Sequence, residues 1–166
     1  MPLPTWDIFI GFALVAGIAY GFILRREKTI TTLCSTYMAL VVATAVSSYV
    51  FDFLNGNRFF AGQIWIHSNV SLSTVSIILF LPLTFVVSGV IISTNNRAGD
   101  VSPIEVIIYS ALNMALIITS VLGFLPEEVR LKYVETSRLA SFMLNMKTLW
   151  IFLPPVALVI LNFRRK

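Results

Sequence analysis

Long stretches without a charged side chain are the feature that most constrains the fold of this chain. A helix needs roughly 20 apolar residues to cross about 30 Å of hydrocarbon, and a charge at its centre would cost roughly 2.5–3.5 kcal/mol. Four segments reach or approach that length with no charge near the middle: Trp6–Leu24, Thr29–Phe51, Thr74–Ser93 and Val106–Leu125. The sequence therefore predicts an all-α, polytopic helical membrane protein with four transmembrane helices.

The amino-acid composition indicates lipid, and not water, as the solvent. Apolar residues make up 57% of the chain and charged residues only 12%, whereas soluble domains carry about 25% charged residues. We therefore expect residues 1–166 to form a single membrane domain with no soluble domain. The basic residues lie at the ends of apolar runs, so the net charge of +4 fits contact with anionic lipid headgroups and not nucleic acid.

A fifth apolar segment, Thr148–Phe163, is shorter and contains the pair Pro154-Pro155. The two prolines remove two backbone donors, and inside a membrane only neighbouring helices can replace them. The segment is predicted to cross the membrane as a short, Pro-kinked helix, with a re-entrant or interfacial segment as the alternative.

Residues 126–146 interleave charged and apolar side chains between the fourth and fifth apolar segments. The stretch opens with Glu127 and Glu128, and acidic residues are favourable at a helix N-terminus. We expect an interfacial amphipathic helix over about 126–146, broken near Thr136-Ser137.

The positions of the basic residues predict the orientation in the membrane. Basic residues follow the first apolar run and do not precede it, which is typical of a retained span and not of a cleaved signal peptide. With five spans and the N-terminus outside, the cytoplasmic segments hold seven of the twelve Lys and Arg residues: Arg25, Arg26, Lys28, Arg97, Arg164, Arg165 and Lys166. Three of the other five, Arg130, Lys132 and Arg138, lie in the amphipathic segment, and a fourth, Lys147, directly follows it. A multi-pass protein with its C-terminus in the cytoplasm is therefore predicted.

Small residues recur at a spacing of four on the first two predicted spans. One stripe is Ala13, Gly17 and Gly21, and the other is Ser35, Ala39, Ala43 and Ser47. Lipid provides no hydrophobic drive for helix association, so close backbone approach over small residues has to provide the packing energy. We expect the two stripes to pack against each other, or one of them to form a subunit interface.

Two polar residues within the predicted spans are candidates for a functional role. Asn113 lies near the middle of the fourth span and needs a hydrogen-bond partner on another helix, for which the hydroxyls of Thr32, Thr36, Thr44 and Ser48 are available. A pore or substrate contact is the alternative for Asn113. Asp7 begins the first span, where an acidic side chain caps a helix or serves as a protonatable or ion-pairing group.

Motifs that would indicate an enzyme or a metal site are missing. One cysteine, Cys34, and one histidine, His67, cannot supply a Cys/His zinc site, and no nucleophile, phosphate-loop or metalloprotease motif occurs. No pair of carboxylates falls inside the predicted spans. We therefore expect a non-enzymatic protein without a cofactor or metal.

The order of features resembles the colicin V production protein (CvpA) family of bacterial inner-membrane proteins. In the first half of the chain, the matching features are Trp6-Asp7 before an apolar run, Gly21 followed by Arg25-Arg26, and a second span rich in small residues. In the second half, they are a basic glycine-containing turn over Asn95–Asp100 and an ending with Ser137, Leu149-Trp150 and Pro154-Pro155. The fourth span departs from the family pattern, since no glycine occurs between Gly99 and Gly123. The resemblance implies location in the bacterial inner membrane, with a link to colicin V export and envelope phenotypes and no catalytic residues.

These observations lead to two functional hypotheses. The first is an accessory or scaffold protein in export or envelope maintenance, self-associating or bound to another membrane protein. The second is a channel or transporter subunit whose polar helix faces line a path when several copies assemble.

Overall fold

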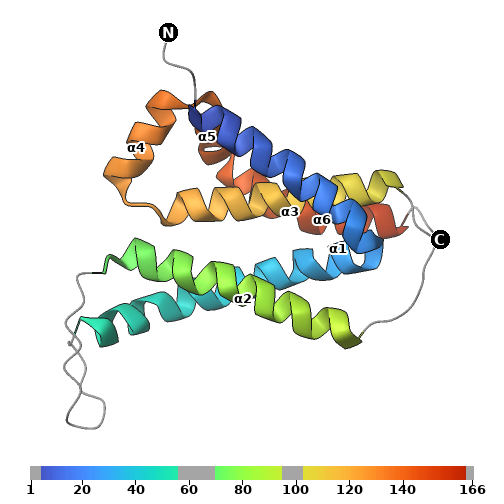
Figure 1. The fold of residues 1–166 in the computed structure, drawn as a ribbon, viewed down its shortest axis with the longest axis horizontal. Coiled ribbons are helices and arrows are strands. Elements are labelled where there is room, and N and C mark those ends of the chain that lie inside the picture. Colours follow the sequence, from blue (N-terminus) through green and yellow to red (C-terminus); the bar gives the residue numbers. More distant parts are fainter. Residues whose placement is uncertain (1–4, 56–69, 95–102, 164–166) are drawn as a thin grey trace.

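The computed structural model describes residues 5–55, 70–94 and 103–163, and all regular elements within these ranges are helices (Figure 1). In chain order they are α1 (Thr5–Leu54), α2 (Leu72–Thr94), α3 (Pro103–Phe124), α4 (Glu127–Thr136), α5 (Arg138–Asn145) and α6 (Lys147–Phe163). Four stretches are long and apolar enough to cross a membrane: Trp6–Leu24, Lys28–Leu54, Leu72–Val90 and Pro103–Phe124. The prediction of an all-α, polytopic membrane protein is confirmed.

The first two spans belong to one helical element, α1, that turns back on itself. Figure 1 shows its first half running away from the N-terminus and its second half returning beside α2. The backbone stays helical through residues 25–28, where a short loop is expected from the sequence. The stretch from Phe22 to Lys28 contains no glycine or proline to end the helix. Across the bend, the Thr29 hydroxyl donates to the Gly21 carbonyl oxygen at 3.4 Å.

The second half of α1 is the centre of the bundle, because it contributes to both hydrophobic clusters. Leu33 packs with Tyr109 and Leu116 of α3, and side chains of α6 cover this cluster. Ala39 and Ala43 pack with the fully buried ring of Phe80 from α2. The second half of α1 therefore holds α2 on one face and α3 with α6 on another.

The C-terminal helices form a bent unit. The break predicted near Thr136-Ser137 lies at Ser137, between α4 and α5. None of the side chains of α4 is buried, whereas α5 buries Ala140 and Met143, so the amphipathic character of the segment belongs to α5. Arg138–Asn145 and Lys147–Ile160 meet at 68°.

The helix α6 continues through its two prolines and packs against the bundle with one face. Its 17 residues span about 25 Å, which is slightly less than the hydrocarbon thickness. Pro154 is fully buried, and Ile151 and Leu158 pack against the cluster formed by α1 and α3. Its first residue, Lys147, lies beside Gly123 near the end of α3. The bend of α1, the start of α3 and the end of α6 lie at the same end of the bundle (Figure 1).

Candidate functional site

Asp7 joins the first turn of α1 to the first turn of α5. Its Oδ1 atom accepts a hydrogen bond from the Ser137 hydroxyl and a second from the backbone N–H of Leu139 at 3.0 Å. The Ser137 hydroxyl oxygen in turn accepts from the N–H of Ala140 at 3.0 Å. The first turn of a helix has backbone donors without intrahelical partners. Asp7 and Ser137 together satisfy two of them, so Asp7 caps a helix 130 residues away instead of its own.

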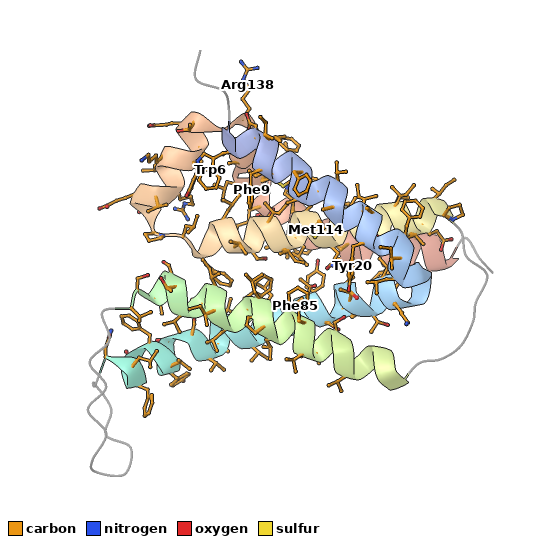
Figure 2. All side chains as sticks on the ribbon, viewed as in Figure 1. Trp6, Phe9, Tyr20, Phe85, Met114 and Arg138 are labelled. Carbon is orange, nitrogen blue, oxygen red and sulfur yellow. The ribbon has the colours of Figure 1, made fainter. Side chains whose placement is uncertain are left out.

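Aromatic side chains surround this joint. The Trp6 ring lies edge-on to Tyr133 of α4, with ring centroids 4.6 Å apart, and to Phe9 at 6.0 Å. Figure 2 shows Trp6 and Phe9 on the side of α1 that faces α4, with Arg138 extending away from the bundle. Such edge-to-face contacts add to the energy of apolar burial. The joint therefore holds α4 and α5 against the start of α1.

Asn113 of α3 points into the bundle and bonds to Thr36 of α1. The Thr36 hydroxyl lies 2.8 Å from Asn113 Oδ1, and both residues are buried. One turn earlier on α1, the Thr32 hydroxyl lies 3.0 Å from the Ser88 hydroxyl of α2. Of the four hydroxyl residues expected as partners for Asn113, Thr44 and Ser48 instead face outward. Thr32 and Thr36 thus tie α1 to two different helices.

Tyr37 replaces a backbone donor that a proline removes from α6. In a helix, the Ile151 carbonyl would accept from the N–H of residue 155, but Pro155 has no N–H. The Tyr37 hydroxyl donates a hydrogen bond to this carbonyl oxygen instead. The donor comes from a neighbouring helix, which is the condition for a proline inside a membrane helix.

Replacing this donor should measurably weaken the bundle. Tyr37→Phe leaves the Ile151 carbonyl without a partner and is expected to lower the free energy of unfolding by about 1 kcal/mol. The measurement is unfolding of the purified protein by SDS in mixed micelles, followed by circular dichroism. Tyr20→Phe is the control, because no hydrogen bond of the Tyr20 hydroxyl occurs in the described part of the chain. Equal effects of the two substitutions would contradict the assigned role.

The glycines of the first small-residue stripe lie against α3. A Cβ atom built on Gly17 would lie 1.8 Å from Cγ of Met114, and one built on Gly21 would lie 1.7 Å from Oγ of Ser110. These distances are far below van der Waals contact, so a Cβ at position 17 would displace the Met114 side chain and one at position 21 would displace Ser110. The two glycines thus allow α1 and α3 to approach closely. Ala13, on the same stripe, is half-buried.

The second small-residue stripe faces α2 and not the first stripe. Ala39 and Ala43 are completely buried against Phe80, and Ser35 and Ser47 are buried on the same helix. The expectation that the two stripes pack against each other is therefore corrected. Each stripe packs against a different helix, because the bend in α1 turns the first half toward α3 and the second half between α2 and α3.

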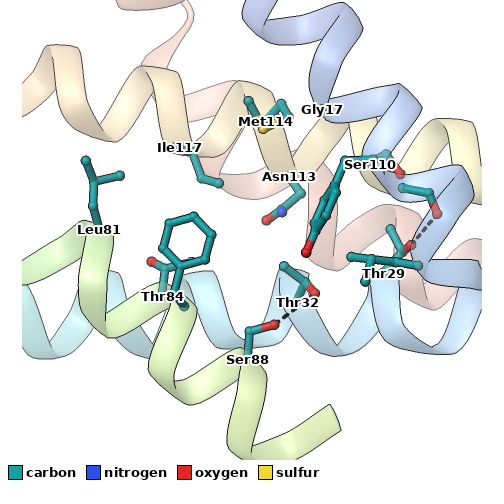
Figure 3. A pocket seen from close by; sticks show the side chains of 14 residues that line it. Gly17, Thr29, Thr32, Leu81, Thr84, Ser88, Ser110, Asn113, Met114 and Ile117 are labelled. Atoms are coloured by element: carbon teal, nitrogen blue, oxygen red, sulfur yellow. Dashed lines mark hydrogen bonds between the residues drawn. The ribbon is translucent and has the colours of Figure 1, made fainter.

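A cavity of about 300 Å³ lies where both halves of α1, α2 and α3 meet (Figure 3). Its apolar wall includes Leu81, Phe85, Met114 and Ile117. Its polar side chains are Tyr20, Thr29, Thr32, Thr84, Ser88, Ser110 and Asn113. None of the described residues that line it is charged, so the cavity is suited to a neutral occupant and not to an ion.

Within the described ranges, no group of three or more His, Cys, Asp and Glu side chains could hold a metal ion. Cys34 is a free, exposed thiol on α1. His67, the basic turn over Asn95–Asp100, and Arg164, Arg165 and Lys166 lie outside the described residues.

Sequence reasoning identified Asp7 and Asn113 and a break near Ser137, but it missed the contact between Ser137 and Asp7, the role of Tyr37 and the cavity. The bonds of Ser137 and Tyr37 depend on helices brought together from distant parts of the chain, which no motif in the sequence indicates. The proline pair was the one available signal, since it requires an outside donor.

Together these features define a multi-pass helical membrane protein whose buried polar side chains join its helices. Comparison with models of protein families, with curated proteins and with solved structures finds no match to this chain.

Proposed function

We propose that this chain is a non-catalytic accessory or scaffold protein of the bacterial inner membrane, similar to the CvpA family and acting in export or envelope maintenance. The observation that supports this most is the use of polar side chains on α1. Thr32 joins it to α2, Thr36 to α3 and Tyr37 to α6. Asp7 joins it to α5.

Burying a polar group inside a membrane costs free energy unless the group has a hydrogen-bond partner. The partners of the polar groups on α1 therefore indicate what these groups contribute to the fold. Here they hold helices in fixed positions, and each bond joins α1 to a different partner. A fixed frame with a largely apolar outer surface suits a protein that presents binding faces to other membrane proteins. The exposed apolar side chains of the first span, such as Phe12 and Ile23, provide such a face.

The arrangement of the helix ends supports the predicted orientation. The bend of α1, which carries Arg25, Arg26 and Lys28, lies at the same end of the bundle as the last residues of α6 (Figure 1). In the sequence, Arg164, Arg165 and Lys166 follow α6 directly. Basic residues gathered at one end favour a cytoplasmic location for that end.

A scaffold protein should be isolated in an assembly. Purification from native membranes in a mild detergent, followed by mass measurement of the intact species, is expected to give a mass above that of the 18.5 kDa chain, as a multiple or with a fixed partner. An unaccompanied 18.5 kDa species, both in detergent and after chemical cross-linking in the membrane, would contradict the proposal.

A channel or transporter subunit is the second candidate function, and the uncharged, partly polar cavity favours it. On this hypothesis, proteoliposomes containing the protein take up a neutral solute such as glycerol, and Asn113→Leu abolishes the uptake. The matched control is Thr44→Val, because the Thr44 hydroxyl faces outward and donates to carbonyls of its own helix. Uptake that equals that of protein-free liposomes would contradict this candidate.

A further inference from the structure

We propose that the cavity between α1, α2 and α3 binds an uncharged lipid with a free hydroxyl group, such as a long-chain alcohol. The hydroxyl group of the ligand forms a hydrogen bond with the Asn113 amide inside the cavity, and its apolar chain extends out of the cavity between Tyr20 and Phe85. This inference concerns a ligand site and does not depend on the scaffold function proposed above.

The cavity is reached from the side of the bundle. Tyr20 and Phe85 both line it, yet 54% of the Tyr20 surface and 71% of the Phe85 surface is exposed. Figure 2 shows the two residues on opposite sides of the space between α2 and the first half of α1, with Met114 nearby. Both lie inside segments that are long and apolar enough to span a membrane, and we infer from this that the opening faces acyl chains.

Two of the hydroxyls in the wall, those of Thr84 and Ser110, have already used their protons within their own helices. Thr84 donates to the Phe80 carbonyl oxygen at 2.9 Å, and Ser110 donates to the Val106 carbonyl oxygen at 2.6 Å. Threonine and serine in membrane helices commonly bond back in this way. No charged group is present among the described lining residues to neutralise a charged ligand, and burial of an unpaired charge would be costly.

Asn113 is the side chain that points to a specific ligand group. Only 7% of its surface is exposed, it lines the cavity, and its Oδ1 atom is occupied by Thr36. Its Nδ2 atom has no hydrogen-bond partner among the described residues. If the amide is turned over, Nδ2 bonds to Thr36 and Oδ1 becomes the free atom. A hydroxyl group can both accept and donate, so it satisfies Asn113 in either orientation.

The size of the cavity fits the head of such a lipid. At about 300 Å³ it is at the small end of the range for ligand pockets. It therefore holds a hydroxyl and the first part of a chain, and Leu81 and Ile117 provide apolar contacts for that part. The remainder of the chain would lie among the lipids outside Tyr20 and Phe85.

The test uses the full-length protein in liposomes with a long-chain alcohol that carries a photoreactive diazirine near its hydroxyl end. After illumination, the labelled residues are identified by mass spectrometry. The proposal predicts adducts concentrated on Met114, Ile117 and Leu81, with little label on the lipid-facing Phe12 and Val15. Label distributed equally over both groups would overturn it.

Competition then tests the chemistry of the ligand. Unlabelled dodecanol should displace the probe, whereas dodecane, which lacks the hydroxyl, and dodecyl phosphate, which is charged, should compete at least about fivefold less well, the effect of roughly one hydrogen bond. Equal competition by dodecane would show an unspecific apolar cavity, and stronger competition by dodecyl phosphate would show a phospholipid site. Either outcome overturns the proposal.

Two variants keep the test independent of folding. Asn113→Leu should weaken competition by dodecanol about fivefold, but it also removes the bond to Thr36. Thr84→Phe fills the cavity, leaves that bond intact and should remove most of the label from Met114. Thr44→Val is the matched control, since its side chain faces away from the cavity, and its labelling should equal that of the natural protein. Unchanged labelling of Met114 in Thr84→Phe would overturn the proposal.

Discussion

Gly21→Val is expected to be the most damaging single substitution in the membrane-spanning part of the chain. Its side chain would need the space occupied by Ser110, whose Cβ atom lies 2.6 Å from a Cβ built at position 21. Ser110 is buried and has no long side chain to move aside, so the first half of α1 must separate from α3. We expect a loss of about 3 kcal/mol in the free energy of unfolding, at the upper end for overpacking, measured by SDS unfolding in mixed micelles.

Two other glycines on the same helix provide the controls. A Cβ at Gly11 meets no atom within 4 Å, so Gly11→Val should change the free energy of unfolding by less than about 0.5 kcal/mol. Gly17→Ala should be less damaging than Gly21→Ala, because Met114 can change its rotamer whereas Ser110 cannot yield in this way. If Gly11→Val and Gly21→Val are equally damaging, close packing of α1 on α3 is contradicted.

Asp7→Ala is expected to release α5 from the start of α1. The substitution removes the acceptor for the Ser137 hydroxyl and for the Leu139 N–H, so the first turn of α5 loses its cap. Exchange of the Leu139 amide hydrogen, followed by mass spectrometry in detergent, should become faster by about tenfold or more. Asp52→Ala, near the other end of α1, should leave this exchange unchanged.

A conservative variant separates the two roles considered for Asp7. Asp7→Asn keeps an oxygen that can accept from Ser137 and Leu139, so exchange at Leu139 should remain close to that of the natural protein. Slow exchange combined with loss of biological function would assign Asp7 a role as an ionisable group. Fast exchange in Asp7→Asn, equal to that in Asp7→Ala, would contradict capping by the side-chain oxygen.

The membrane spans could be predicted because their signal is local. Each is a run of apolar residues of sufficient length, and the structure places helices over all four predicted spans. The break at Ser137 was also visible, since Thr136-Ser137 interrupts an amphipathic pattern. The helical bend at residues 25–28 could not be predicted from the sequence, because basic residues between two spans are compatible with either a loop or a bent helix.

Which helices contact each other could be predicted only in part. Asn113 was expected to bond to one of four hydroxyl residues, and Thr36 is the one that the structure brings to it. Stripes of small residues indicate close approach but carry no chemistry that identifies a partner, so the expected pairing of the two stripes was wrong. Ser137 lies 130 residues from Asp7, and no pattern in the sequence connects them.

The polar contacts of α1 also suggest how the bundle resists separation. Lipid does not drive helices together, so packing and hydrogen bonds have to hold them. Close contact at Gly17 and Gly21 fixes the first half of α1 on α3, and the bonds of Thr36 and Tyr37 fix its second half. Loss of the hydrogen bond of Thr36 or Tyr37 should lower the free energy of unfolding but leave the helix arrangement unchanged. Loss of the close contact at Gly17 and Gly21 should displace the whole first span from α3.

Cysteine cross-linking in native membranes tests the central claim, which is that the first half of α1 packs on α3. In a Cys34→Ala background, a Cβ built at position 17 lies 3.0 Å from Cβ of Met114, near the separation of about 3.8 Å found in disulfides. Gly17→Cys combined with Met114→Cys should therefore form a disulfide within one chain on mild oxidation, and Gly17→Cys combined with Ala43→Cys should not. A disulfide in the second pair and none in the first would contradict the arrangement of the bundle.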